Sequence, residues 1–244
     1  LARLGYDLFS PVFFMGGYVI VSGLCVIAIL SLHFIKIPHP SSVGISFSGR
    51  PLLDIVRQPL FLFAVISSML GYGAMTFVMT ATPLAMQSCG LNFTDTAFVI
   101  QWHALAMFSP SFFTGHLIRR FGGVQIVMFG IILNLTCMII NMSGDTFTHF
   151  TFGLICLGIG WNFMFIGGTT LLTEVYKKSE QSKVQATNDF FVFSSVAVAS
   201  LLSGIIQDSL GWVYINGLIF APMLISTCFA IWYYFISYHK IYRP

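Results

Sequence analysis

The side chains best suited to chemistry in this sequence lie within long apolar segments. Gln101 and His103 share one such segment, and Asn162 lies in another. Lipid offers polar groups no hydrogen bonds, so amide and ionisable side chains within it are candidates for function by default. His103 is suited to bind a solute or to relay protons near neutral pH. The alternative is that His103 makes a structural hydrogen bond to a neighbouring helix.

Two pairs of glycines mark related places in two apolar segments. The pairs are Gly71 with Gly73 and Gly158 with Gly160. Such paired interruptions indicate the central site of a transporter, where they act as hinges. They equally allow two helices to pack closely, and both explanations stay open. The side chains expected to line a substrate cavity are Tyr72, Met75, Thr76, Gln101, His103, Trp161 and Asn162.

Catalytic and metal-binding motifs are missing from the sequence. It contains no HExxH, nucleophile elbow, phosphate loop or zinc-type cluster, and four of its five cysteines lie in apolar segments. We therefore expect no catalytic residues, no metal and no cofactor. The net charge of +3 is small and dispersed, which argues against a nucleic-acid partner.

Membrane-spanning helices must position these side chains. Charged residues make up 8% of the sequence and hydrophobic residues 57%, whereas soluble domains carry about 25% charged residues. A spanning helix needs about 20 mostly apolar residues. The sequence therefore predicts an all-α integral membrane protein with seven transmembrane helices. The expected spans are 12–35, 59–87, 96–118, 124–141, 150–173, 186–206 and 214–237.

The distribution of lysine and arginine predicts the orientation of these helices. All but Arg3 fall in alternate connections, and basic residues are retained on the cytoplasmic side. The C-terminus is therefore expected in the cytoplasm. The cytoplasmic residues would be Lys36, Arg50, Arg57, Arg119, Arg120, Lys177, Lys178, Lys183, Lys240 and Arg243.

Two adjacent arginines suggest a gate on the cytoplasmic side. Arg119 and Arg120 form the turn between the third and fourth predicted spans, and we expect them to pair with Glu174 or Asp189 when that side closes. An exposed pair of this kind contributes only about 0 to 1 kcal/mol. Asp189 is also predicted in the first turn of its helix, where the helix dipole favours a carboxylate. That structural explanation stays open.

An internal repeat supports a transporter architecture. "LGYGAMTF" (70–77) matches "LGIGWNFM" (157–164), and "SFFTGHLIRRFGGV" (111–124) matches "SLLSGIIQDSLGWV" (200–213). The repeat unit is three helices. Because three is odd, the second copy enters the membrane from the opposite side, which gives the 3+3 inverted repeat of secondary transporters.

The turn "GHLIRRFGG" resembles the loop motif of the major facilitator superfamily. Gly115, Leu117, Arg120 and Gly122 match that motif, whereas Arg119 replaces its aspartate, which weakens any transfer of the aspartate's gating role. The segments "QWHALAMFSPSFFTGHLIRRFG", "GWNFMFIGGTTLLTEVY" and "NDFFVF" also resemble largely uncharacterised bacterial permeases. The resemblance covers all 244 residues and implies helices six to twelve of twelve.

This resemblance implies a domain organisation and a function. Residues 1–35 would end an N-terminal bundle, 36–58 would be a cytoplasmic linker, 59–237 the C-terminal six-helix bundle, and 238–244 a cytoplasmic tail. The implied protein is a secondary transporter of a small organic solute in the bacterial inner membrane. It would work by alternating access, with coupling to a proton or ion gradient as one possibility. Its partners would be the lipid bilayer, the solute and the missing helices one to five. The alternative is a truncated membrane remnant or a module that needs a partner half.

Overall fold

The computed structural model describes residue 9, residues 15–36 and residues 49–242. The chain divides into two units, residues 1–47 and residues 48–244, and each is described by itself. In the first unit, α2 (Met15–His33) is an apolar helix of 19 residues in which Gly16 is the one buried residue. Its length and composition suit a membrane span.

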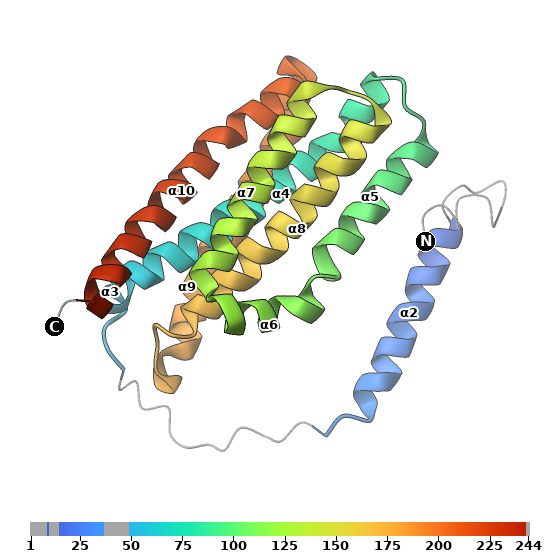
Figure 1. The fold of residues 1–244 in the computed structure, drawn as a ribbon. Helices are drawn as coiled ribbons and strands as arrows, with labels where there is room; N and C mark the ends of the chain where they lie inside the picture. The colour runs from blue at the N-terminus through green and yellow to red at the C-terminus, as the bar shows by residue number, and fades with distance from the viewer. Residues whose placement is uncertain (1–8, 10–14, 37–48, 243–244) are drawn as a thin grey trace. The chain divides into compact units, whose positions relative to one another are not determined.

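The second unit is a bundle of helices (Figure 1). Its elements in chain order are α3 (Leu52–Val56), α4 (Pro59–Ser88), α5 (Phe93–Phe108), α6 (Ser111–Phe121), α7 (Gly123–Ser143), α8 (Phe147–Leu172), the 3-10 turn η1 (Lys178–Glu180), α9 (Gln181–Leu210) and α10 (Trp212–Tyr242).

Six of the seven predicted spans correspond to helices that suit a membrane by length and composition. Within the described residues these are α2, α4, α7, α8, α9 with η1, and α10. Long apolar runs made these helices predictable, because few other structures bury so many consecutive apolar residues.

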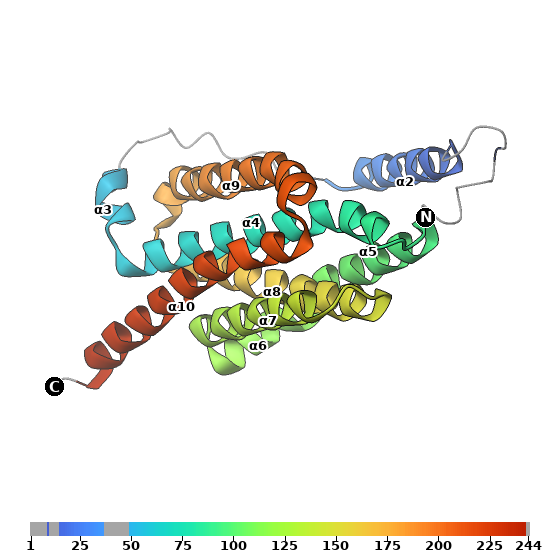
Figure 2. The ribbon, with the colours of Figure 1, turned by 90° about the horizontal axis from the view of Figure 1, so that it is seen from above.

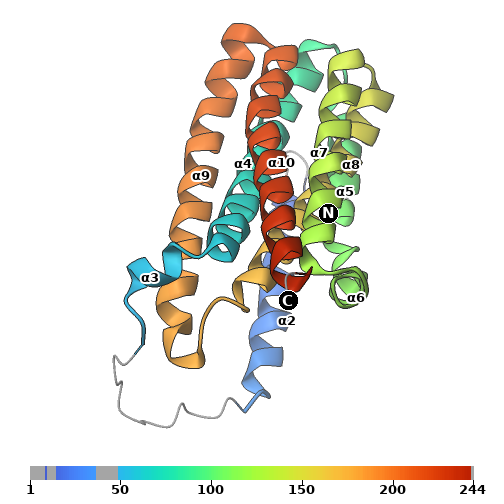
Figure 3. The same ribbon diagram turned by 60° about the vertical axis from the view of Figure 1, so that its left-hand side comes forward.

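The remaining predicted span, the third in chain order, was wrong: residues 96–118 do not form one continuous helix. The structure divides this segment into α5 and α6, which meet at Ser109 and Pro110. Proline lacks an N–H and its ring crowds the preceding turn, so a helix bends or ends there. The amides of Phe113 and Thr114 begin a new helix by donating to the Pro110 carbonyl, both at 2.8 Å. Figure 3 views α6 nearly along its axis, whereas α5 and the neighbouring helices run lengthwise.

The helices α4 and α8 form the centre of the bundle. The helix α8 packs against α4, α5 and α7, while α4 also packs against α9 and α10. Figure 2 shows α4 between α9 and α8. Two buried polar side chains of α4 bond to their own helix: Ser68 Oγ donates to the Ala64 carbonyl at 2.9 Å and Thr82 Oγ1 to the Val78 carbonyl at 2.8 Å. The apolar faces of α4 and α8 therefore supply most of the core.

The helix α9 begins earlier than the sequence predicts, which corrects the position of Asp189. The expected start was residue 186, but the helix begins at Gln181 directly after η1. The Glu180 carboxylate accepts a hydrogen bond from the Lys177 amide at 3.0 Å and so caps this turn. Asp189 consequently lies beyond the second turn of α9, where the helix dipole no longer explains its charge.

The boundaries of the linker and the tail also differ from expectation. The predicted linker 36–58 contains the short helix α3, and its residues 37–48 lie outside the described residues. The helix α10 continues to Tyr242 and so covers most of the predicted tail, of which residues 243–244 are not described.

Candidate functional site

Aromatic side chains from four helices meet in one cluster, called here the aromatic surface. Its members are Tyr72 of α4, Phe108 of α5, Trp161 and Phe165 of α8, and Phe193 of α9. The Tyr72 ring stands edge-on to Trp161 and to Phe165, with centroids 5.3 and 5.1 Å apart. Trp161 and Phe165 stack with centroids 5.4 Å apart. The aromatic surface therefore contains both ring pairs that stack face to face and ring pairs that meet edge to face.

Helix geometry explains why these rings meet. Trp161 and Phe165 are four residues apart and therefore lie on one face of α8. Gly71 lets α4 approach that helix, since a Cβ atom on Gly71 would lie 2.7 Å from Cβ of Met164. The neighbouring Tyr72 is thereby brought against Trp161. The paired glycines of α4 and α8 both serve close helix packing here, and both helices continue through them without a break.

The aromatic surface runs from the protein interior to its exterior. Trp161 is 5% exposed, whereas Phe108 is 61% exposed and Phe193 is 57% exposed. Tyr72 and Phe165 are half-buried. A planar molecule that contacts the exposed rings of Phe108 and Phe193 would therefore lie beside a continuous series of aromatic side chains that ends at Trp161.

Two hydroxyl groups of α4 are close to this surface in sequence: the Tyr72 hydroxyl belongs to it, and Thr76 lies one helical turn away. Tyr72 and Thr76 lie one turn apart on α4 and are half-buried, and neither hydroxyl has a hydrogen-bond partner in the described part of the chain. Thr82 on the same helix instead donates to the Val78 carbonyl at 2.8 Å. The Tyr72 and Thr76 hydroxyls are thus available to a bound molecule.

The two predicted cavity residues of α5 do not lie together, because one is exposed and the other is buried. Gln101 is exposed and lines a shallow pocket of about 430 Å³ together with Phe108. His103 is fully buried, and its Nδ1 lies 2.8 Å from the Leu154 carbonyl of α8. This geometry fits the alternative in which His103 bonds to a neighbouring helix. Met75 is also buried, at 4% exposure, and faces the core.

The Asn162 side chain makes hydrogen bonds to residues on both sides of the break between α5 and α6. Its Nδ2 donates to the Met107 carbonyl of α5 and to the Ser111 hydroxyl of α6, both at 2.7 Å. Its Oδ1 accepts from the Thr114 hydroxyl at 2.6 Å. Asn162 is fully buried and all three of these bonds are internal, so the structure gives it a role in holding helices together.

The gate candidates do not pair with one another within the described residues. Arg119 lies 3.1 Å from Nδ1 of His116, and Arg120 lies over the Phe121 ring at 5.3 Å. Asp189 accepts a hydrogen bond from its neighbour Asn188, and Glu174 is exposed. Among residues 15–36 and 49–242, no three potential metal-ligating side chains come together.

The structure shows an ion pair that the sequence analysis missed. Glu180 is 1% exposed and accepts three bonds from Arg50: from the backbone amide at 2.8 Å, from Nε at 3.0 Å and from Nη2 at 2.7 Å. Arg50 Nη2 also donates to the Val175 carbonyl, and Lys183 Nζ to the Arg50 carbonyl. The hydrogen bond and charge of Glu180 raise the pKa of the Arg50 guanidinium above its ordinary value. We call these contacts the Arg50–Glu180 clamp.

A sequence signal for this clamp existed. Glu180 is the one acid in the basic stretch "YKKSEQSK", and an acid placed among lysines is a candidate for pairing. Phe165 was also missed as a site residue, although its spacing of four from Trp161 places both on one helix face.

Breaking the Arg50–Glu180 clamp is expected to lower thermal stability. Arg50→Gln and Glu180→Gln should each reduce the unfolding temperature, and the double variant should be little worse than either, since all three lose the same pair. Thermal unfolding of the purified protein in detergent measures this. Arg57→Gln, at an exposed site on the same connection, is the matched control and should have little effect. Additive losses in the double variant would contradict a direct coupling.

Close packing at Gly158 predicts a second stability effect. A Cβ atom there would lie 2.8 Å from the His103 carbonyl of α5, so Gly158→Ala should destabilise the bundle by about 1 to 3 kcal/mol. Gly204→Ala on α9 is the control, because no heavy atom lies within 4 Å of the added methyl. Chemical unfolding in mixed micelles compares the two variants. Equal stabilities would show that α5 and α8 are not held this closely.

The comparisons with known proteins agree with this helical bundle. The family model described as Major Facilitator Superfamily matches residues 66–244. The "Riboflavin transporter RfnT" of Brucella anthropi is 42% identical over 216 residues, which are 88% of this chain and 54% of that protein.

Two Bacillus subtilis proteins are also similar. "Uncharacterized MFS-type transporter YddS" is 31% identical over 164 residues, covering 66% of this chain and 37% of YddS. "Uncharacterized MFS-type transporter YdeG" is 34% identical over 134 residues, covering 54% and 31%. The aligned parts span between about a third and a half of these relatives. The chain is an integral membrane protein that belongs to the major facilitator superfamily.

Proposed function

We propose that the complete protein carrying this chain is a secondary transporter of a planar heteroaromatic solute, with riboflavin as the leading substrate. The aromatic surface is the observation that carries this proposal, because its stacked rings lie with the Tyr72 hydroxyl and one helical turn from the Thr76 hydroxyl, and neither hydroxyl has a hydrogen-bond partner among the described residues. The similarity to a protein named as a riboflavin transporter supports the same substrate. Membership of a transporter family favours this function over an enzyme and over a non-transporting remnant or module.

The chemistry of the flavin ring fits the aromatic surface. Isoalloxazine is flat, and stacking of such a ring on an aromatic side chain contributes about 1 to 3 kcal/mol. Trp161 and Phe165 would supply the stacking faces. The Tyr72 and Thr76 hydroxyls would donate to the carbonyl and nitrogen acceptors at the ring edge.

Helix packing supports an inverted repeat and alternating access. The second helix of each three-helix set packs against the first helix of the other set, since α5 lies against α8 and α9 lies against α4. This exchange is the pattern expected of two repeats related by a pseudo-two-fold axis. We propose that the bundle rocks against a second bundle built from earlier helices of the full protein, in the bacterial plasma membrane with the C-terminus in the cytoplasm.

The gate and the energy source are part of the same proposal. Arg119 and Arg120 are exposed at the end of α6, where they could meet acids of the opposite bundle. Arg120→Gln should lower uptake without lowering the amount of protein in the membrane. Coupling to a proton or ion gradient would be seen as loss of accumulation when an ionophore collapses that gradient.

Uptake by cells tests the proposed substrate. The complete native protein is expressed in a bacterium that cannot make riboflavin or import it, and uptake of radiolabelled riboflavin is measured. We expect saturable uptake that unlabelled riboflavin suppresses and that ribitol does not. Absence of uptake by protein that is present in the membrane would overturn the proposal.

A further inference from the structure

The shallow pocket on α5, called here the α5 pocket, adjoins the aromatic surface. Its volume is about 430 Å³, and it is lined by Gln101, Ala104, Leu105, Phe108, Ser109 and Phe112. Phe108 belongs to both features, because it lines the pocket and its ring centroid lies 6.0 Å from that of Trp161. A molecule that stacks on Trp161 can therefore extend a substituent past Phe108 into the α5 pocket.

Helical periodicity places much of the α5 pocket on one exposed face of the helix. Gln101, Leu105 and Phe108 are separated by four and three residues, so their side chains lie one above the other. Leu105 is 46% exposed, Phe108 is 61% exposed, and Gln101 is also exposed. His103 of the same helix is fully buried and does not line the pocket. A bound molecule can therefore reach the α5 pocket without displacing the core.

Two polar side chains of the α5 pocket have no hydrogen-bond partner among the described residues. They are the Gln101 amide and the Ser109 hydroxyl, and both residues are exposed. Ser109 directly follows Phe108, whereas Gln101 precedes Phe108 by seven residues, or about 10 Å along the helix. The pocket thus offers a hydroxyl next to the aromatic surface and an amide about two helical turns away from it.

The polarity of the α5 pocket suits a neutral chain of hydroxyl groups. None of the six residues that line it is charged. A charged group that left water for this pocket would find no opposite charge to offset its desolvation. A hydroxyl group both donates and accepts, so it can pair with either end of the Gln101 amide and with the Ser109 hydroxyl. The Phe108 and Phe112 rings can pack against the carbon atoms of such a chain.

We propose that the α5 pocket binds the ribityl chain of the transported flavin. This inference rests on the proposed function, in which the isoalloxazine ring stacks on Trp161 and Phe165. Ribityl hydroxyls close to the ring pair with Ser109, and hydroxyls near the end of the chain pair with Gln101. The aromatic surface then selects the ring, while Gln101 and Ser109 select the chain.

A comparison of riboflavin with lumiflavin tests this assignment. Lumiflavin has the same ring but carries a methyl group in place of the ribityl chain. The complete protein in lipid nanodiscs is titrated with each flavin, and binding is followed by the loss of flavin fluorescence that stacking on tryptophan causes. We expect riboflavin to bind about tenfold more tightly, the effect of one to two hydrogen bonds.

Two variants separate recognition of the chain from a general effect on folding. Gln101→Leu should weaken riboflavin binding about fivefold, the effect of one lost hydrogen bond, and should leave lumiflavin binding unchanged. Ser109→Ala should act in the same way, and the double variant should bind the two flavins with similar affinity. Damage to the fold would instead weaken the binding of both flavins.

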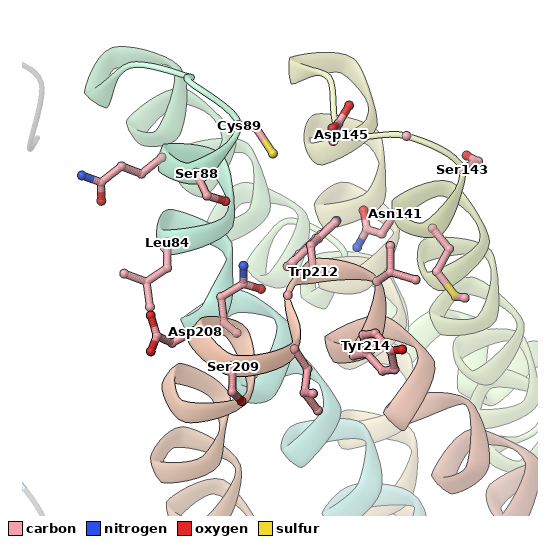
Figure 4. Close-up of a pocket in the computed structure, with 17 residues that line it drawn as sticks. Leu84, Ser88, Cys89, Asn141, Ser143, Asp145, Asp208, Ser209, Trp212 and Tyr214 are labelled. Atoms are coloured by element: carbon pink, nitrogen blue, oxygen red, sulfur yellow. The ribbon is translucent and has the colours of Figure 1, made fainter.

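Gln87→Leu is the matched control. Gln87 is exposed near the end of α4 and lines a different cavity, of about 950 Å³, which Figure 4 shows. Because Gln87 lies 15 residues, or about 22 Å, along α4 from Tyr72, its loss should change neither affinity.

The titrations distinguish failure of the ribityl site from failure of the proposed substrate. The assignment of the α5 pocket would be overturned if lumiflavin bound as tightly as riboflavin, or if Gln101→Leu weakened riboflavin binding no more than Gln87→Leu. Either result would leave riboflavin as the substrate. Absence of binding by both flavins would overturn the proposed substrate together with the ribityl site.

Discussion

Trp161→Ala is expected to raise the riboflavin concentration that gives half-maximal uptake by about 5- to 150-fold, because one stacking partner contributes about 1 to 3 kcal/mol. Trp161 contacts Tyr72, Phe108 and Phe165, so its loss removes the inner end of the aromatic surface. Trp161→Phe keeps a ring there and should lose less. Initial rates of radiolabelled uptake, normalised to protein in the membrane, measure the effect.

The control for this prediction is the same change at a different site. Trp232 on α10 is 43% exposed, and its ring contacts Phe229 of its own helix. Trp232→Ala should leave uptake within about twofold of the parent protein, as substitutions at exposed sites usually change little. Equal losses at Trp161 and Trp232 would mean that the aromatic surface does not bind the substrate.

Asn162→Leu is expected to destabilise the bundle by about 2 to 3 kcal/mol. It removes three bonds between helices, each worth about 0.6 kcal/mol on average in membrane proteins, and takes from the buried Met107 carbonyl of α5 the partner that Asn162 supplies. Reversible unfolding in mixed micelles with increasing SDS measures the free energy of unfolding. The junction of α5 and α6 should also become more accessible to protease.

Thr136→Val is the matched control for Asn162. The Thr136 hydroxyl donates to the Ile132 carbonyl of its own helix at 2.9 Å and joins no second helix. Its loss should cost less than about 1 kcal/mol. A similar cost for both changes would show that Asn162 does not hold the break in place.

The apolar pattern of the sequence predicted most of the fold, but it could not locate the break in the third span. Hydropathy averages over about 20 residues, and the segment 96–118 is apolar enough on average. The break depends on Pro110 and on Asn162, whose partners Met107 and Ser111 are 55 and 51 residues away in sequence. Asn162 itself was recognised as a buried polar residue that needs partners, whereas its partners came only from the three-dimensional contacts.

The site was predictable only in part for a related reason. Tyr72 and Trp161 were identified from their positions beside paired glycines, and the structure brings them together. Phe108 and Phe193 are two of 26 phenylalanines, so composition alone did not distinguish them from rings that face lipid. The Arg50–Glu180 clamp joins residues that are 130 positions apart in the sequence. Helical periodicity relates only residues within one helix, so it could not predict this pair.

The order of synthesis delays formation of the Arg50–Glu180 clamp. Arg50 leaves the ribosome 130 residues before its partner, and at about 5 to 20 residues per second this delay is roughly 7 to 26 s. Throughout that interval the helices from α4 to α8 are made before Glu180, the partner of Arg50, has been added to the chain. The Arg50–Glu180 pair can therefore form only after the five helices α4 to α8 have been made, so its formation is a late step of assembly in the membrane.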